Sequence, residues 1–169
     1  MVKEQAIVIL IPDNKHVDEV RKKHDWFYKE SKPHTTIVYP FKLKNQKQLD
    51  KHIEQSIKNI KQFSLTLKGL EKSKKDFYLY LLVNKGKKEI LKLYEQSRSK
   101  LLTKFKNEDM PKYIPHMTLG SFKSKKDIDN AIKEIKKKKI EVNFTVKEIC
   151  LLTFKKRAEI RSIKRFKLK

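Results

Sequence analysis

The sequence predicts an α+β protein in which two similar lobes face each other across a cleft. Apolar runs typical of β-strands alternate along the chain with the three- and four-residue spacings of amphipathic helices. The order of these elements repeats with a period of about 80 residues, which is too long for a solenoid unit. We therefore expect one bilobal domain over residues 1–169, with pseudo-two-fold halves at about 1–75 and 76–169.

The first half supplies the series strand, helix, strand, helix, strand. AIVILI (6–11) is a short apolar run bounded by Pro12, which is typical of a buried strand. Asp13 or Asn14 would cap the helix that follows. Its inner stripe would comprise Val17, Val20 and Phe27, with Trp26 beside it in the core. The pattern then predicts a strand over 34–41, a helix over 47–60 and a half-buried strand over 63–70.

The second half begins the same series again with FYLYLLV (77–83), a strand that we expect to be buried on both faces. A long helix is predicted over about 87–105, followed by a loop and the strand HMTLGSF (116–122). The next helix carries an apolar stripe of Ile128, Ala131, Ile132 and Ile135. Two strands, at about 140–154 and 158–167, complete the chain.

The composition favours a polyanionic partner. The formal net charge is +23, and a field of this sign attracts RNA or DNA. Lysine accounts for 38 of the 43 basic residues and is spread over nearly the whole chain, so compositional bias is the alternative explanation. The single cysteine, Cys150, excludes an internal disulfide and is expected to be a small buried hydrophobe in a reducing cytosol. The apolar runs are too short to span a membrane, and we expect a cytoplasmic monomer with no membrane partner.

Two histidines share one local pattern, Pro-His-x-Thr-aliphatic, in the matching strands of the two halves. Alternate residues of a strand point to the same face, so His34 projects with Thr36 and His116 projects with Thr118. Phosphodiester cleavage needs one group to accept a proton and another to donate one, and imidazoles titrate close enough to neutrality to do both. Threonine hydroxyls can donate to the phosphate oxygens on which negative charge builds. One such motif would be weak evidence, but the duplicated pair predicts a catalytic site.

The segments His34-Thr35-Thr36-Ile37 and His116-Met117-Thr118-Leu119 resemble the paired H-x-T-x motifs of the 2H phosphoesterase superfamily. The nearest branch is that of the 2'-5' RNA ligase-like proteins, also described as RNA 2',3'-cyclic phosphodiesterases. The resemblance covers nearly the whole chain. It implies two antiparallel β-sheets that line a central cleft, with the helices outside.

The same resemblance implies metal-independent hydrolysis of cyclic phosphates or 2'-5' linkages, without a cofactor and with ligation as a reverse reaction. His34 and His116 would be the acid and the base, and Thr36 and Thr118 would hold the phosphate. The expected partner is RNA that ends in a cyclic phosphate, or a small cyclic nucleotide. A linear 2'-5' oligonucleotide and the cyclic phosphate of ADP-ribose are further candidate substrates. The alternative is a module that binds RNA or a nucleotide in the same basic cleft without chemistry.

Four further residues are candidates for contacts with the substrate. Tyr39 matches a position where the family often has phenylalanine, although its spacing of three from Thr36 equally fits a core position. Tyr113 could stack on a base or pack within its loop. Ser121 stands where many relatives have arginine, in H-x-T-L-G-R, and Lys123 could supply a point charge in its place. The other histidines, His16, His24 and His52, share no metal-ligand spacing.

Overall fold

A computed structural model describes residues 3–73, 76–105, 113–155 and 158–169. The strands are β1 (Glu4–Leu10), β2 (His34–Lys42), β3 (Phe63–Lys72), β4 (Tyr78–Lys85), β5 (His116–Ser121), β6 (Glu141–Val146), β7 (Glu148–Phe154) and β8 (Ile160–Lys167). The helices are α1 (Lys15–His24), α2 (Gln46–Ile57), α3 (Lys87–Ser97) and α4 (Lys125–Lys137), with a 3₁₀ helix, η1, at Lys100–Phe105. Among these described helices, none is long and apolar enough to cross a membrane.

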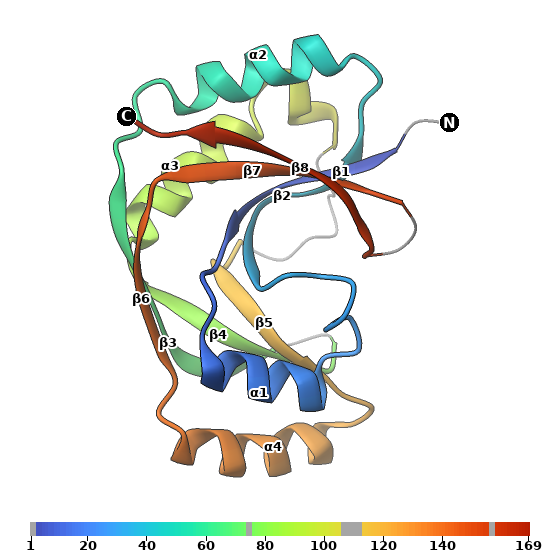
Figure 1. The fold of residues 1–169 in the computed structure, drawn as a ribbon, viewed down its shortest axis with the longest axis vertical. Helices are drawn as coiled ribbons and strands as arrows, with labels where there is room; N and C mark the ends of the chain where they lie inside the picture. Colours follow the sequence, from blue (N-terminus) through green and yellow to red (C-terminus); the bar gives the residue numbers. More distant parts are fainter. Residues whose placement is uncertain (1–2, 74–75, 106–112, 156–157) are drawn as a thin grey trace.

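The strands form a curled antiparallel sheet in the order β6-β3-β4-β5-β2-β1-β7-β8. The four-stranded halves of this sheet meet where β2 pairs with β5, and the register there is a single residue pair, Thr35 with Met117. The predicted α+β fold is therefore confirmed, with the two expected sheets joined at this seam. The helices lie outside the sheet, α2 and α3 at one end of the molecule and α1 and α4 at the other (Figure 1).

The two halves of the sequence exchange strands across the seam. β3 follows the first histidine strand in the chain but pairs with β4 and β6, and β7 pairs back with β1. The helices are exchanged in the same manner, because α1 packs against β5 and α3 packs against β2. Each lobe of the sheet is consequently built from both halves of the sequence, and the two motifs meet at its centre.

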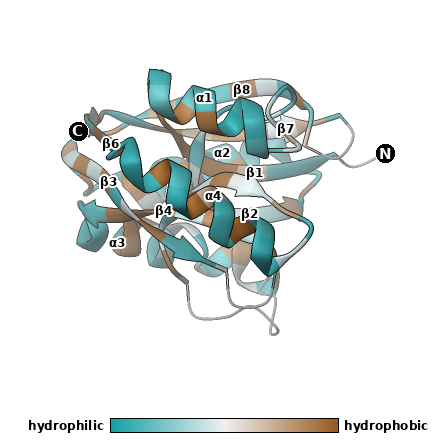
Figure 2. Cartoon of the chain, turned by 90° about the horizontal axis from the view of Figure 1, so that it is seen from below, coloured by the Kyte–Doolittle hydropathy of each residue, from teal (hydrophilic) through white to brown (hydrophobic). Residues whose placement is uncertain are grey.

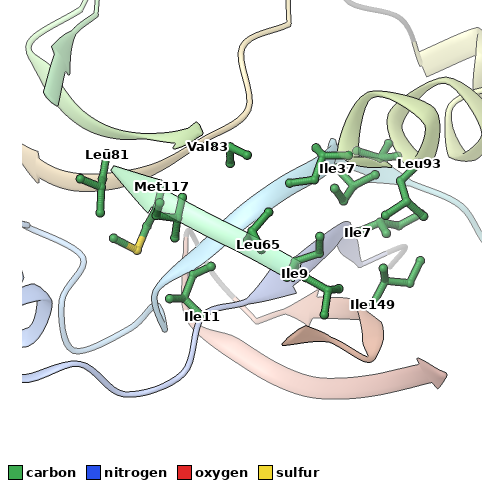
Figure 3. Close-up of a cluster of buried hydrophobic side chains, with 14 of the residues drawn as sticks. Ile7, Ile9, Ile11, Ile37, Leu65, Leu81, Val83, Leu93, Met117 and Ile149 are labelled. Carbon is green, nitrogen blue, oxygen red and sulfur yellow. The ribbon is translucent and has the colours of Figure 1, made fainter. Parts of the chain in front are cut away.

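The two faces of the central strands carry different side chains. The face toward the helices holds the main apolar core, to which β1 contributes Ile7 and Ile9 and α3 contributes Leu93 (Figure 3). A smaller buried cluster on the opposite face comprises Ala6, Val8, Cys150 and Leu152. His34 pairs with Leu10 and Thr36 pairs with Val8, so the motif side chains share the face of the smaller cluster.

The cap of α1 and the apolar stripe of α4 follow the predicted patterns. Asn14 caps α1 by accepting hydrogen bonds from the backbone N–H groups of His16 and Val17. α4 presents a hydrophilic outer face and buries Ile128, Ala131 and Ile135, an amphipathic pattern that is visible in Figure 2. Cys150 is buried, as its apolar surroundings predict.

Five expectations about the elements are wrong. The strand over 77–83, expected to be buried on both faces, begins at Tyr78 and buries only one face. Phe27, expected on the inner stripe of the first helix, lies beyond the end of α1 at His24.

The helix predicted over 87–105 ends at Ser97, and Lys100 has a positive φ of 49°, so the apolar pattern continues in η1 instead. The strand predicted over 140–154 is two strands, because the chain changes partner from β3 to β1 around Lys147. Trp26, expected in the core, is 61% exposed, since α1 ends at His24 and a turn follows.

Candidate active site

The register at the seam brings the two H-x-T motifs together. Thr35 and Met117 are paired and point into the core. In an antiparallel pair this register sets His34 opposite Thr118 and His116 opposite Thr36 on the other face. Opposite residues have Cβ atoms about 5 Å apart and diagonal ones about 7–8 Å, so the two imidazoles lie on a diagonal across the seam. Sequence reasoning predicted these four residues, and the structure brings them together.

Both imidazoles are oriented by the same kind of hydrogen bond to a backbone carbonyl. Nδ1 of His34 lies 2.7 Å from the carbonyl oxygen of Lys32, and Nδ1 of His116 lies 2.7 Å from that of Ile114. A carbonyl only accepts hydrogen bonds, so Nδ1 carries the proton in each ring. Nε2 is thereby left for proton exchange, as a neutral base or, once protonated, as an acid.

Burial lowers the pKa of both catalytic candidates. Desolvation is the main cause of the lowered pKa of His34, and the Arg21 charge lowers it further. Desolvation likewise dominates the lowered pKa of His116, and the charge of His34 adds to the effect. The hydrogen bonds to the backbone carbonyls oppose this shift in each ring. The influence of the His34 charge on the pKa of His116 agrees with the diagonal placement of the two rings.

A row of aromatic rings leads away from His116 along β4. The His116 and Tyr80 rings stack with centroids 3.8 Å apart, and Tyr80 and Tyr78 are nearly parallel with centroids 6.5 Å apart. Tyr78 and Tyr80 share a face because they are two residues apart on one strand. Sequence reasoning missed both, since FYLYLLV predicts only a buried strand. The alternation of tyrosine with leucine is the signal that indicates one face is not core.

A cavity of about 240 Å³ opens beside the motif residues. His34 and Thr118 line it from the two sides of the seam, which supports the register given above. Its remaining wall residues come from α1 and the following turn, from β4 and β5, and from the segment before β8. They are Arg21, Asp25, Phe27, Ser31, Lys32, Pro33, Tyr78, Ser121 and Ala158.

A buried ion pair stabilises one wall of this cavity. Arg21 donates from Nε and Nη2 to the Asp25 carboxylate at 2.9 and 2.7 Å, and the two side chains are 5% and 4% exposed. Arg21 also donates to the carbonyl oxygen of Ser31 at 2.7 Å. The next residue, Lys32, provides the carbonyl that binds His34. Arg21 therefore positions the segment that orients His34, a role that sequence patterns do not indicate.

Tyr39 lies between the core and the site. The β2 register shifts near Ile37, because Thr36 pairs with Val8 whereas Val38 pairs with Ile7. This bulge lets Ile37 and Val38 both be buried and returns the next residue to the face of Thr36. The half-buried Tyr39 packs on the core and meets Tyr113 edge to face at 6.5 Å. Burial and the neighbouring Tyr80 raise its pKa.

Tyr113 is fixed within the protein. Its hydroxyl donates to the carbonyl oxygen of Thr36 at 2.7 Å, and its ring stacks on Tyr94 with centroids 3.9 Å apart. The ring is 9% exposed, and burial raises its pKa strongly. This geometry favours the packing role and links the segment before His116 to the first motif.

The remaining two candidates lie at different depths. Ser121, on β5, is 4% exposed and lines the cavity. Its Oγ has no hydrogen-bond partner among the residues that the structure describes. Lys123 is exposed and is not among the residues lining the cavity. The cavity wall beyond the second motif is thus neutral and hydroxyl-bearing.

The other three histidines lie on helices and are not among the residues that line the cavity. His16 is exposed on α1, His24 packs on Phe122 with ring centroids 5.2 Å apart, and His52 is buried with Nε2 2.7 Å from the carbonyl oxygen of Ser97. Within the described part of the chain, no group of three or more His, Cys, Asp or Glu residues is placed to hold a metal ion.

Known structures share this fold. E. coli LigT in its apo form superposes with a TM-score of 0.63 at 16% identity and covers 99% of this chain and 98% of its own. E. coli LigT complexed with 3'-AMP gives 0.65 at 16% identity, over 100% and 99% of the two chains. Kluyveromyces marxianus Usb1 gives 0.57 at 12% identity, over 99% of each chain. No curated protein matches the sequence.

A family model describes most of the chain. It spans residues 11–158, which include both H-x-T motifs and the seam between them. The resemblance to 2H phosphoesterases is therefore confirmed. The chain belongs to the 2'-5' RNA ligase superfamily.

Proposed function

We propose that the protein is a metal-independent phosphodiesterase that opens 2',3'-cyclic phosphates at RNA ends or on related nucleotides. The observation that carries the proposal is the arrangement of four side chains at the seam, in which each motif's imidazole lies opposite the other motif's hydroxyl. We call these four residues the quartet: His34, Thr36, His116 and Thr118. This arrangement offers two acid–base groups and two donors to a single phosphate. Membership of the 2'-5' RNA ligase superfamily supports an enzyme of this class.

The quartet accounts for every proton in the reaction. One neutral imidazole removes a proton from water as the water oxygen attacks phosphorus. The bond from phosphorus to one ribose oxygen then breaks, and the second, protonated imidazole gives its proton to that oxygen. The hydroxyls of Thr36 and Thr118 donate to the phosphate oxygens as charge accumulates on them. The product is a phosphate monoester with a free neighbouring hydroxyl.

The two histidines have closely matched surroundings. Each ring donates from Nδ1 to the carbonyl two residues earlier, and burial lowers the pKa of each. Either ring can therefore serve as acid or base. Ligation through a 2'-5' linkage is the reverse of cyclic-phosphate formation, and exchange of the two roles is what such a reversal requires.

The test is product analysis with the four nucleoside 2',3'-cyclic phosphates and a short RNA that ends in a cyclic phosphate, all with excess chelator. The expected result is a single 2'- or 3'-monoester whose formation is lost in folded His34→Ala and His116→Ala variants. His16→Ala is the matched control, because His16 is exposed on α1. Full turnover in either motif variant would overturn the mechanism.

The panel also separates catalysis from binding alone. A net charge of +23 is sufficient for salt-sensitive attraction to RNA without any chemistry. RNA that binds tightly at low salt, with no product from any cyclic phosphate, would replace the phosphodiesterase with a non-catalytic RNA-binding module.

A further inference from the structure

We propose that a second cavity, at the amino-terminal end of β1, is a phosphate site separate from the quartet. This distal cavity has a volume of about 590 Å³, within the range of about 300–1,000 Å³ that is usual for pockets that hold a small molecule. Its wall comes from β1, β7 and β8 and from the residues around the start of α2. The lining residues are Lys3, Gln5, Leu43, Lys44, Gln46, Thr153, Arg161 and Ser162.

The distal cavity and the quartet lie on opposite faces of the sheet. Gln5 is two residues from Ile7 and therefore shares the face of the main core, whereas the quartet lies on the face of Val8. His34 pairs with Leu10, which is five residues from Gln5, or about 17 Å along the strand. A nucleotide whose phosphate occupies the quartet does not reach this cavity, so the distal site is independent of the proposed reaction.

A row of polar side chains crosses three strands at the distal cavity. Gln5 on β1 pairs with Thr153 on β7, and Thr153 pairs with Ser162 on β8. Directly paired residues point to the same face of a sheet. Two residues further along β1 and back along β7, Ile7 and Leu151 belong to the main core on this face. Gln5 is only 4% exposed, so the row begins with a hydrogen-bonding group at a position where the core pattern would place an apolar one.

The inner end of this row is held in one orientation. Gln5 Nε2 donates to Gln46 Oε1 at 2.8 Å, and Gln46 Nε2 donates to the Asp50 carboxylate at 2.9 Å. Lys164 donates to the other oxygen of Asp50 at 2.8 Å and neutralises this acid. Because the two amides are already ordered, a ligand that enters the cavity has little ordering of these side chains left to impose.

The charge of the distal cavity is entirely positive. The described residues that line it include three exposed cations, Lys3, Lys44 and Arg161, and no acid. Among the residues that the structure describes, no ion pair involves any of the three. The cavity beside His34 differs, because its arginine is paired with Asp25. The charges in the distal cavity are therefore available to an anion.

A β-bulge brings Arg161 to the distal cavity. Phe154 pairs with Ile160 and Thr153 pairs with Ser162, so Arg161 is an extra residue on β8. A bulge turns a side chain out of the regular alternation and is common beside functional sites. Arginine can bind two phosphate oxygens through parallel N–H groups, and the two lysines add point charges. The Thr153 and Ser162 hydroxyls can donate to the remaining oxygens. The ligand class is thus a phosphate group, carried by a small molecule or by an RNA strand.

The test follows backbone amide shifts by NMR during titration with three probes: inorganic phosphate, uridine 5'-monophosphate and a short single-stranded RNA. The amides of Thr153 and Ser162 report on the distal cavity, and those of the two motif threonines report on the quartet, so each site gives its own Kd. Lys44→Gln/Arg161→Gln should raise the Kd at the distal cavity about tenfold or more, because charge-assisted hydrogen bonds to the phosphate are lost. The Kd at the quartet should stay unchanged.

Lys133→Gln/Lys137→Gln is the matched control. It removes the same charge from exposed positions on α4, at the opposite end of the molecule from α2 (Figure 1). This variant should bind all three probes as the parent does. An equal loss at the distal cavity in both double variants would show an effect of overall charge and would overturn the site. Thermal unfolding of each variant verifies that folded proteins are compared.

The probes also separate the sources of the phosphate. Saturable shifts at Thr153 and Ser162 with inorganic phosphate or the nucleotide would assign the distal cavity to a small ligand, and saturation with RNA alone would assign it to a strand. No saturable shift with any probe would overturn the proposal. Equal shifts with a glutamate peptide would also overturn it, in favour of an acidic protein partner. A failure of the phosphodiesterase would leave these results unaffected, because none of them depends on turnover.

Discussion

At the scale of single residues, the site depends on neighbours that point in opposite directions. Thr36 faces the quartet, whereas Thr35 is fully buried in the core, where its hydroxyl has no partner among the described residues. The two positions carry the same residue type on one strand. They therefore separate the effect of the hydroxyl that we propose to be catalytic from that of a threonine in general.

Replacement by the isosteric valine should have contrasting effects at these positions. Thr36→Val should lower kcat/KM for a cyclic nucleotide by about 100-fold or more, because one donor to the developing phosphate charge is lost. Thr35→Val should retain activity and raise the free energy of unfolding by about 1 kcal/mol, because an unpaired buried hydroxyl is removed. Steady-state kinetics and urea unfolding give both values. Equal activity loss in the two variants would contradict the assignment of faces.

The lowered histidine pKa values predict the pH dependence. The proposed mechanism needs one imidazole neutral and the other protonated, and burial lowers the pKa of each below the usual value of 6.5. On acidification the base becomes protonated, and as the pH rises the acid loses its proton, so both limbs move to lower pH. The profile of kcat/KM should peak below pH 6.5 and decline from pH 7 to 8. An optimum at pH 7.5 or above would contradict this account, and His16→Gln should leave the profile unchanged.

At the scale of elements, each motif strand is held in place by a hydrogen bond that involves a residue outside that strand. The hydroxyl of Tyr113 binds the Thr36 carbonyl, so the segment before β5 is tied to β2. Arg21 on α1 ties down the segment before β2 through Ser31. Because the seam itself has one residue pair, these ties fix how the two lobes meet.

Removing the Tyr113 hydroxyl should therefore affect stability and activity together. Tyr113→Phe should lower the free energy of unfolding by about 1 kcal/mol and leave the Thr36 carbonyl without this donor. A several-fold fall in kcat/KM should accompany it, since Thr36 belongs to the quartet. Tyr28→Phe is the control, because the Tyr28 hydroxyl donates to Asp18 on the surface. Chemical denaturation and kinetics of the two variants would show the difference, and identical behaviour would argue against the tie.

The order of elements and the four motif residues could be predicted from the sequence, because strand alternation and a repeated motif are local signals. The end of α3 could not be predicted from the sequence, because Leu101, Leu102 and Phe105 keep a helical spacing that a 3₁₀ helix also satisfies. The split between β6 and β7 depends on which distant strand each one pairs with. Arg21 joins the site only through folding, and nothing in its local sequence distinguishes it from a surface residue.

At the scale of the whole molecule, the exchange of strands makes the two halves dependent on one another. A fragment of residues 1–75 would contain β1, β2 and β3, but β3 has its partners β4 and β6 in the other half. A fragment of 76–169 would contain β7, whose partner β1 is missing. We accordingly propose one folding unit rather than two independent lobes.

Fragments 1–75 and 76–169 should each be largely unfolded when expressed alone, and mixing them should restore the circular dichroism of the intact chain. The reason is that neither fragment can complete a four-stranded half of the sheet. Fragments cut within α4 serve as a comparison. That cut separates β1–β5 from β6–β8, so it also divides both four-stranded halves of the sheet. A cooperative thermal transition in fragment 1–75 alone would contradict a single folding unit.

The pairing of β1 with β7 also sets the order of events during synthesis. Gln5 on β1 pairs with Thr153 on β7, so β1 leaves the ribosome long before β7 has been synthesised. Until then one of its edges has unpaired N–H and C=O groups, a state that invites association between nascent chains. Because basic residues exceed acidic ones along the chain, growing copies repel one another through that interval. The lysine excess thus also protects the protein while it is being made.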